Sequence, residues 1–192
     1  MREIRDLGEG KRIALLWMHE FEEENPATSR RETEKKGILF PLNELFGTAE
    51  ISLKYYGNGK PYLENISGVI PISHSHDLLV ILHDSLSEHT GVDVEQVREK
   101  VLKIRHKFLS EREKLFIAEK NVLSHIIAWC VKESVYKIHA EGKLDFIENI
   151  WLEEFTESNT EVRAKCVTDT ISFSKKFRIE KIGNYVLFYP LN

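Results

Sequence analysis

Two short segments carry acidic side chains at spacings suited to a single metal and phosphate site. The first, Gly91-Val92-Asp93-Val94-Glu95, is rich in valine and predicts a strand. Side chains alternate between the faces of a strand, so Asp93 and Glu95 should point the same way while Val92 and Val94 point into a core. Mg²⁺ takes oxygen ligands, usually one or two protein carboxylates with phosphates and water. The acidic pair can supply half of such a site, although an isolated pair of this kind is more often a solvated polar face.

The second segment, Ser124 to Ala140, predicts one helix because apolar residues recur at helical intervals without proline or glycine. Glu133 and Lys137 lie four residues apart and so share a face, with Trp129 one turn earlier. A Glu–Lys pair at this spacing is also an ordinary surface ion pair worth about 0.2–0.5 kcal/mol. If Glu133 faces the acidic pair of the strand, however, three carboxylates repel unless a divalent cation joins them. Lys137 is then placed to meet phosphate oxygens.

Upstream, the segment Tyr56-Gly57-Asn58-Gly59-Lys60-Pro61 predicts a hairpin turn, since Asn-Gly is a strong hairpin signal. Its glycines let backbone amides approach an anion and Lys60 adds a positive charge, so the turn also suits a phosphate. Ser73 and His74 can hydrogen-bond a phosphate, although a histidine near a strand end is more often a simple polar residue. No nucleophile elbow of the type G-x-S-x-G accompanies them, so nothing favours a Ser-His hydrolase.

In chain order, four motifs resemble the signatures of the 4'-phosphopantetheinyl transferase superfamily, the Sfp-like branch in particular. They are G-K-P at 59–61, I-S-H-S at 72–75, G-V-D-V-E at 91–95 and W-C-V-K-E-S-V-Y-K at 129–137. The stretch F-L-S-E-R-E at 108–113 is similar to the segment between two of them, so the resemblance covers about residues 57 to 140. It implies an α+β fold in which two similar halves pack about a pseudo-twofold axis and join near residues 85–89. Residues 1–87 would bind coenzyme A, and residues 88–192 would bind the metal and perform catalysis.

The resemblance further implies Mg²⁺-dependent transfer of the 4'-phosphopantetheine group of coenzyme A to a serine of an acyl or peptidyl carrier protein. The carrier passes from its apo to its holo form, and adenosine 3',5'-bisphosphate is released. Glu133 would also be the base, which requires it to reach the serine hydroxyl directly or through one water. The residues that match by position are Asp93, Glu95 and Glu133 for the metal, Glu133 and Lys137 for catalysis, and Lys60, Ser73, His74 and Arg31 for coenzyme A.

One region departs from the resemblance. Members of this branch usually hold the 3'-phosphate of the donor with basic residues on an N-terminal helix, and Arg31 aligns with one of them. A second such position is Leu39 in this chain, with Lys36 about one turn earlier. Gly37 and Pro41 weaken the helix itself. Either Lys36 substitutes from the neighbouring turn, or the chain binds its donor weakly or serves another use.

The composition, with 42% hydrophobic and 30% charged residues in a chain of 192, predicts a soluble globular protein with a substantial core. The longest apolar runs, such as Leu78 to Leu82, are too short to span a bilayer, and the first residues lack a signal-peptide hydrophobic region. We therefore expect a cytoplasmic protein without a membrane partner. Cys130 and Cys166 form no C-x-x-C motif, so neither a disulfide scaffold nor a zinc site is indicated. The length of two halves favours a monomer.

A net charge of −4 argues against a general nucleic-acid binder, yet six basic residues follow the acidic strand closely. This basic cluster is a solvated helix face or a surface that steers an acidic carrier protein toward the site. Its members are Arg98, Lys100, Lys103, Arg105, His106 and Lys107.

The pattern of apolar residues predicts an α+β order of elements, with the late strands forming an antiparallel sheet that has one solvent-facing side. Ser110 and Glu113 form a capping-box signature. Strands are expected at 13–18, 70–73, 78–84, 91–95, 162–167, 171–179 and 185–189, and helices at 30–46, 97–107, 110–119 and 124–140.

Two other functions remain open from the residues alone. One is a module that binds coenzyme A or a carrier protein without turnover, which the altered position Leu39 suggests. It would have no need of a metal aligned with a base. The other is a metal-dependent nuclease, because acidic pairs also serve phosphodiester hydrolysis. The net negative charge and the G-K-P and S-H-S motifs favour a small nucleotide-like donor instead.

Overall fold

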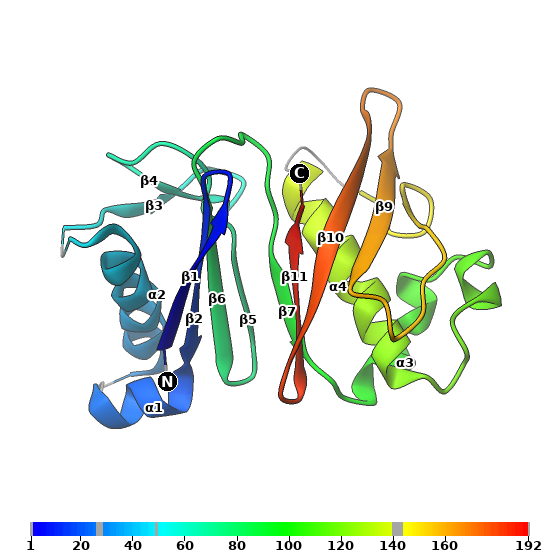
Figure 1. Cartoon of the computed structure of the whole chain (residues 1–192), viewed down its shortest axis with the longest axis horizontal. Coiled ribbons are helices and arrows are strands. Elements are labelled where there is room, and N and C mark those ends of the chain that lie inside the picture. Colours follow the sequence, from blue (N-terminus) through cyan, green and yellow to red (C-terminus); the bar gives the residue numbers. More distant parts are fainter. Residues whose placement is uncertain (1, 26–28, 49, 140–143, 192) are drawn as a thin grey trace. The chain divides into compact units, whose positions relative to one another are not determined.

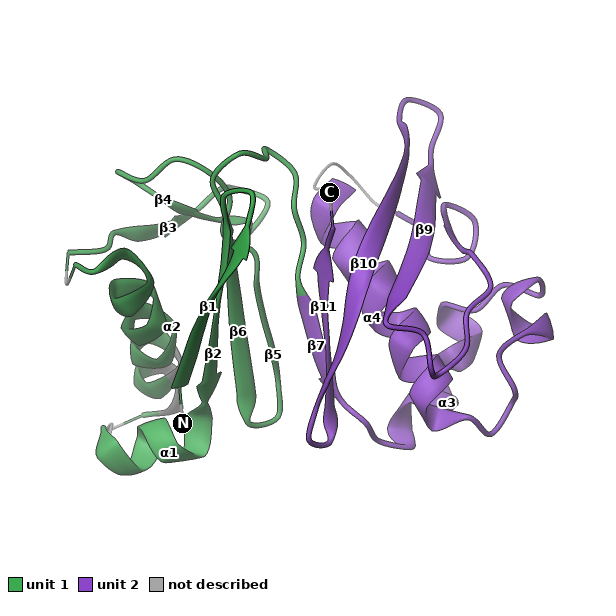
Figure 2. Cartoon of the chain, viewed as in Figure 1, with its two compact units in different colours: residues 1–92 green, residues 93–192 purple. Residues whose placement is uncertain are grey.

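The computed structural model describes residues 2–25, 29–48, 50–139 and 144–191. The chain divides into two compact units, Met1–Val92 and Asp93–Asn192, which Figure 2 shows in different colours. Each unit combines an antiparallel sheet with helices (Figure 1), so the predicted α+β class is confirmed. None of the helices in these ranges is both long and apolar enough to cross a membrane.

The first unit is built on a four-stranded antiparallel sheet in the order β1-β2-β6-β5. Helix α2 packs its apolar side on this sheet, where Leu42 lies against Ile81 in a buried cluster. A separate hairpin, β3-β4, carries the glycine-rich turn. The bounds are β1 Arg2–Gly8, β2 Lys11–Trp17, α1 Met18–Glu24, α2 Arg30–Phe46, β3 Leu53–Tyr55, β4 Pro61–Leu63, β5 Ile72–Ser75 and β6 Leu78–Asp84.

Helix α2 has the bounds that the sequence predicts, and local signals explain both ends. The Ser29 side chain accepts a hydrogen bond from the backbone N–H of Glu32, which caps the first turn. Gly47 ends the helix in the left-handed conformation at φ 66°. Within the helix, a Cβ on Gly37 would lie 2.8 Å from Cε of Met18, so glycine permits close packing there. The helix also runs through Pro41.

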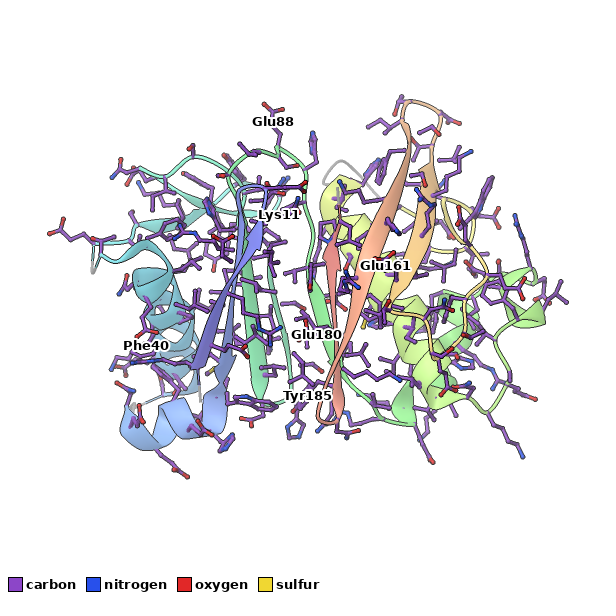
Figure 3. All side chains as sticks on the ribbon, in the orientation of Figure 1. Lys11, Phe40, Glu88, Glu161, Glu180 and Tyr185 are labelled. Carbon is purple, nitrogen blue, oxygen red and sulfur yellow. The ribbon has the colours of Figure 1, made fainter. Side chains whose placement is uncertain are left out.

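The second unit is built on a five-stranded antiparallel sheet in the order β7-β11-β10-β9-β8, so β7 is an edge strand. Along β9 the residues alternate between buried and exposed, as predicted for a sheet with one wet face. On the wet side Glu161 of β9 (labelled in Figure 3) pairs with Lys176 and Arg178 of β10. The bounds are β7 Asp93–Gln96, α3 Lys100–Ile104, η1 Arg105–Lys107, η2 Glu113–Leu115, α4 Val122–His139, β8 Ile150–Leu152, β9 Glu161–Val167, β10 Ser172–Ile182 and β11 Tyr185–Pro190.

Helix α4 covers the inner face of this sheet. Asn121 caps its start by accepting a hydrogen bond from the Ser124 N–H at 2.9 Å. Ile127, Val131 and Val135 are fully buried and recur at helical intervals. They pack with the inward side chains of the strands in a single core cluster. The helix is therefore held to the sheet along most of its length.

Lys132 joins α4 to neighbouring segments of the second unit. Its side chain is fully buried, and Nζ donates hydrogen bonds to Oε2 of Glu113 at 2.8 Å and to the carbonyls of Phe146 at 2.7 Å and Ile150 at 2.8 Å. All three ammonium protons are used. The Glu113 carboxylate also accepts from the N–H groups of Ser110 and Leu152. The network joins α4 to the η2 turn and to β8.

Several of the predicted elements differ in the structure. The prediction of a helix at 110–119 is wrong, because only the single 3₁₀ turn η2 forms there. The capping-box contacts of Ser110 and Glu113 are nevertheless present. The helix expected at 97–107 shortens to α3 followed by η1. The strands β1 and β8 and the helix α1 were not predicted. The last residue of the helix predicted at 124–140, Ala140, lies outside the described residues.

Replacing Lys132 with methionine should destabilise the second unit. The change leaves the buried Glu113 carboxylate without its cation, which typically costs about 3–5 kcal/mol. The free energy of unfolding, measured with urea, should fall by that amount. In the double variant Lys132→Met/Glu113→Gln much of the loss should return. The exposed control Lys165→Met should change stability by no more than about 0.5 kcal/mol, and an equally small effect of Lys132→Met would contradict the structural role of the pair.

Candidate active site

The acidic pair of β7 faces helix α4. Asp93 pairs in register with Phe188 of β11 and Glu95 with Val186, and these two partners belong to the core beneath the helix. Val94 pairs with Leu187 on the opposite face, where it is also buried. Val92 and Val94 are buried as predicted, but the carboxylates also face buried residues, which was not predicted. Both faces of β7 are buried at this point, and the carboxylates share the α4 face.

Two contacts join α4 to these carboxylates. Lys137 Nζ lies 2.8 Å from Oδ1 of Asp93, and the side chain of Asp93 is only 5% exposed. About two turns earlier, the Trp129 indole N–H donates to Oε1 of Glu95 at 3.2 Å. A single side of the helix thus meets an edge strand some forty residues distant in sequence, at positions set by the helical repeat.

Glu133 lies between Trp129 and Lys137 on the same side of α4 and is partly buried. Burial raises the pKa of Glu133 to about 7, and the negative charges of Asp93 and Glu95 add to this rise, while the Lys137 ammonium opposes it. The three carboxylates are thus close enough to repel one another. A partly buried carboxyl whose pKa is raised toward neutral pH is also typical of groups that move protons.

The three carboxylates suit Mg²⁺ in their chemistry more than in their present arrangement. Across the residues that the structure describes, no three His, Cys, Asp or Glu side chains are arranged to hold a metal ion together. The donor set is nevertheless all carboxylate oxygen, which Mg²⁺ prefers. Its mutual repulsion raises the pKa of Glu133, and a positive group, the Lys137 ammonium, already binds Asp93. The residues therefore fit a divalent cation by charge and donor type.

Cys130 is a neighbour of this site that sequence reasoning interpreted only as a small helical residue. It is fully buried and lies near the Asp93 carboxylate. Burial raises the pKa of the thiol, and the charges of Asp93 and Glu95 raise it further. The thiol is thus a neutral neighbour of Asp93 and not a nucleophile. Its place three residues before Glu133 on a helix was the only available signal.

Aromatic side chains flank Glu133 on the solvent side of α4. Phe146 lies between Trp129 and Tyr136, with ring centroids 5.6 and 5.8 Å away. Tyr136 is 42% exposed. On the other side of Trp129 is a hollow of about 170 Å³. Its lining residues are Glu95, Gln96, Arg98, Lys100, Val101, Ile104, Ile126 and Trp129.

In the first unit, the predicted hairpin turn is confirmed, with Gly59 at φ 83° and the Tyr56 N–H bonded to the Lys60 carbonyl. Lys60 Nζ donates to the Glu88 carbonyl at 3.4 Å, and burial lowers the pKa of this lysine. Ser73 is buried and His74 exposed at successive positions of β5, so they lie on opposite faces of that strand. The structure does not bring these two to one face.

The region that departs from the resemblance lies on α2. Arg31 belongs to this helix, but its side chain lies outside the described residues. Lys36 Nζ pairs with Oε1 of Glu32 at 2.7 Å, one turn earlier on the same helix. Leu39 instead lines a hollow of about 450 Å³, and the lysine that shares this lining is Lys35. The full lining is Lys35, Ile38, Leu39, Ile51, Ser52, Leu53 and Tyr55.

Comparison with known proteins matches residues 89–190, more than half of the chain, to the family model of the 4'-phosphopantetheinyl transferase superfamily. The 4'-phosphopantetheinyl transferase gsp of Aneurinibacillus migulanus is 30% identical over 101 residues, which are 50% of this chain and 41% of that protein. The match thus spans less than half the length of this relative. The family match contains β7 and α4, and with them Trp129 and Lys137, which contact the acidic pair.

The stability of the metal-free protein should fall as the pH rises from about 4.5 to 7. The unfolded Glu133 carboxyl ionises near 4.5 and the folded one near 7, so the native state binds more protons in this window. The fall should be at most about 3.5 kcal/mol, at about 1.4 kcal/mol per pKa unit, and smaller where solvent screens the partly exposed carboxyl. Urea unfolding in EDTA at several pH values measures it. Glu133→Gln should lose this part of the fall, whereas the exposed control Glu148→Gln should keep it, and identical profiles for both variants would refute the assignment.

Proposed function

Because the chain belongs to the 4'-phosphopantetheinyl transferase superfamily, we propose that it transfers the 4'-phosphopantetheine group of coenzyme A to a serine of an acyl or peptidyl carrier protein. The other product is adenosine 3',5'-bisphosphate. The observation that carries the proposal is the meeting of Asp93, Glu133 and Lys137 between β7 and α4. A binding module without turnover would not need a buried carboxyl of raised pKa beside a second carboxylate and a lysine.

Asp93, Glu95 and Glu133 would hold Mg²⁺ in this proposal. When bound there, the ion would neutralise the charge that develops on the pyrophosphate as the phosphoanhydride bond breaks. The protein contributes the orientation of its own ligands. The Trp129 indole donates a hydrogen bond to the Glu95 carboxylate, and the Lys137 ammonium pairs with Asp93. Such supporting hydrogen bonds hold ligating oxygens in place.

Glu133 would accept the proton of the attacking serine hydroxyl. Its pKa, raised to about 7 by burial, lies close to the operating pH that general base catalysis favours. Lys137, one turn later on α4, would contact the phosphate that is transferred. The half-exposed ring of Tyr136, packed on Phe146, offers an apolar surface beside Glu133 for the arm of the donor.

Residues 1–87 would bind the nucleotide part of coenzyme A, and residues 88–192 would bind the metal, in two halves related by a pseudo-twofold axis. Lys60, Ser73, His74 and Arg31 are the proposed contacts. The hollow beside Leu39 modifies this set, because Lys36 is paired with Glu32 while Lys35 lines the hollow. Leu39 carries no positive charge, so we infer that Lys35 supplies the charge that binds a donor phosphate at this position.

The carrier protein would approach over α3 and η1. Arg105 is already paired with the Glu119 carboxylate, so it contributes less to this surface than the sequence suggested. Lys103 and Lys107 are exposed. The adjoining hollow, with Val101 and Ile104 in its lining, can take an apolar side chain of the carrier. Acidic carriers would be steered by the lysines.

The transfer is tested by incubating the protein with coenzyme A, Mg²⁺ and an apo carrier protein and weighing the carrier by mass spectrometry. A gain equal to one phosphopantetheine group is expected. Asp93→Ala and Glu133→Gln should each lower the rate at least about a hundredfold, the lower range for loss of acid–base catalysis, with unchanged circular dichroism. Binding of the carrier without any gain would favour the non-catalytic module, and cleavage of added DNA would favour a nuclease.

Charge reversal at Lys103→Glu/Lys107→Glu should raise KM for the carrier about tenfold at low ionic strength, because electrostatic steering speeds encounter by ten- to a thousandfold. kcat at saturating carrier should stay unchanged, and the difference in KM should shrink as salt is added. The charge-matched control Lys165→Glu/Lys181→Glu lies on the sheet and should leave KM unchanged. Equal effects of both pairs would place carrier docking elsewhere.

A further inference from the structure

Lys137 holds the carboxylate that a divalent cation also needs. Its Nζ lies 2.8 Å from Oδ1 of Asp93, and the two side chains are 27% and 5% exposed. A second cation on the same carboxylate would be only a few ångströms from the ammonium, where like charges repel strongly in a partly buried site. A cation bound to Asp93 therefore competes with Lys137 for this carboxylate and favours the departure of Lys137.

The charges around this pair favour the exchange when a further anion is offered to Lys137. Above the pKa of Glu133, as at pH 8, the carboxylates of Asp93, Glu95 and Glu133 carry three negative charges against the one positive charge of the ammonium. A divalent cation compensates the carboxylates better than the ammonium does, but it leaves Lys137 without its 2.8 Å partner. A phosphate of the donor is an anion within the same proposed site and can take that place.

We propose that Lys137 exchanges Asp93 for a donor phosphate, and that this exchange couples the binding of the divalent cation to the binding of coenzyme A. The inference rests on the proposed function, since it takes the cation and the donor from there. Each ligand then raises the affinity for the other by the same factor, as thermodynamic linkage requires. The cation alone binds weakly because it must break the Lys137–Asp93 pair.

The experiment measures Mn²⁺ binding by the electron paramagnetic resonance of the free ion at pH 8, without carrier protein, so that no turnover occurs. Wild-type protein and three variants are titrated with and without coenzyme A. Lys137→Gln removes the ammonium, and Lys137→Arg keeps a cation that can pair with Asp93. The matched control Lys165→Gln removes a lysine from the exposed side of β9.

Without coenzyme A, Lys137→Gln should bind Mn²⁺ about tenfold more tightly than wild type, within the usual 5- to 150-fold range of coupling between sites. Lys137→Arg and Lys165→Gln should bind it like wild type. Coenzyme A should tighten Mn²⁺ binding to wild type, and this effect should be about tenfold smaller in Lys137→Gln. Equal or weaker Mn²⁺ binding by Lys137→Gln would overturn the exchange. Absence of Mn²⁺ binding in every protein, with or without coenzyme A, would instead overturn the proposed metal ligands and the exchange with them.

A measurement on wild type keeps the test valid if Lys137→Gln does not fold. In protein labelled with ¹³C-lysine, the Cε signal of Lys137 is identified by its loss in Lys137→Arg. Addition of coenzyme A in EDTA should move this signal as the ammonium changes partner. A signal that coenzyme A leaves unchanged would also overturn the exchange.

Discussion

A fully buried ammonium sets the geometry of the second unit. Lys132 donates to Glu113 and to two backbone carbonyls, so α4 cannot rotate about its own axis without leaving a buried charge or a buried carbonyl unsatisfied. Glu133 is the next residue. The direction in which the proposed base points is therefore constrained by a neighbour that takes no part in the proposed chemistry, together with the core residues of α4.

The acidic pair lies at a sheet edge and beneath a helix at once, and this location explains its electrostatics. Among the described residues β7 pairs on one side only, with β11, and α4 covers the face that carries Asp93 and Glu95, so Asp93 is almost fully buried. Burial strengthens the repulsion between the carboxylates and the attraction of any cation. The donors from Lys137 and Trp129 reduce the freedom of the two side chains. The site thus combines restricted ligands with an excess of negative charge.

Much of this arrangement was predictable from the residues. The bounds of α2 follow from Ser29, Gly47 and the helical interval, and the spacing of Glu133 and Lys137 predicted their common side. The predictions of secondary structure that were wrong share one cause, because tertiary contacts outweighed the local sequence signals. Ser110 and Glu113 have the signature of a helix start, but the Glu113 carboxylate also binds Lys132 and the Leu152 N–H, and only one turn forms.

Other parts of the fold carried too little local signal. The strand β1 is largely exposed and polar, so it lacks the alternation that marks a half-buried strand. Ser73 and His74 are neighbours in the sequence, and strand alternation therefore places their side chains on opposite faces of β5. The prediction that both contact the donor did not take this alternation into account. The acidic pair was expected on a face apart from the core, because a valine-rich alternation cannot tell which face of an edge strand a distant helix will cover.

Both cysteines lie where α4 meets its sheet, Cys130 on the helix and Cys166 on β9, and both are fully buried. An alkylating reagent can reach either sulfur only when the helix lifts from the strands, since neither thiol is accessible in the closed state. The alkylation rate of the native protein therefore reports how often α4 separates from the sheet. A ligand that binds both the helix and the edge strand would lower this rate, so the two sulfur atoms report the local stability of the helix–sheet contact.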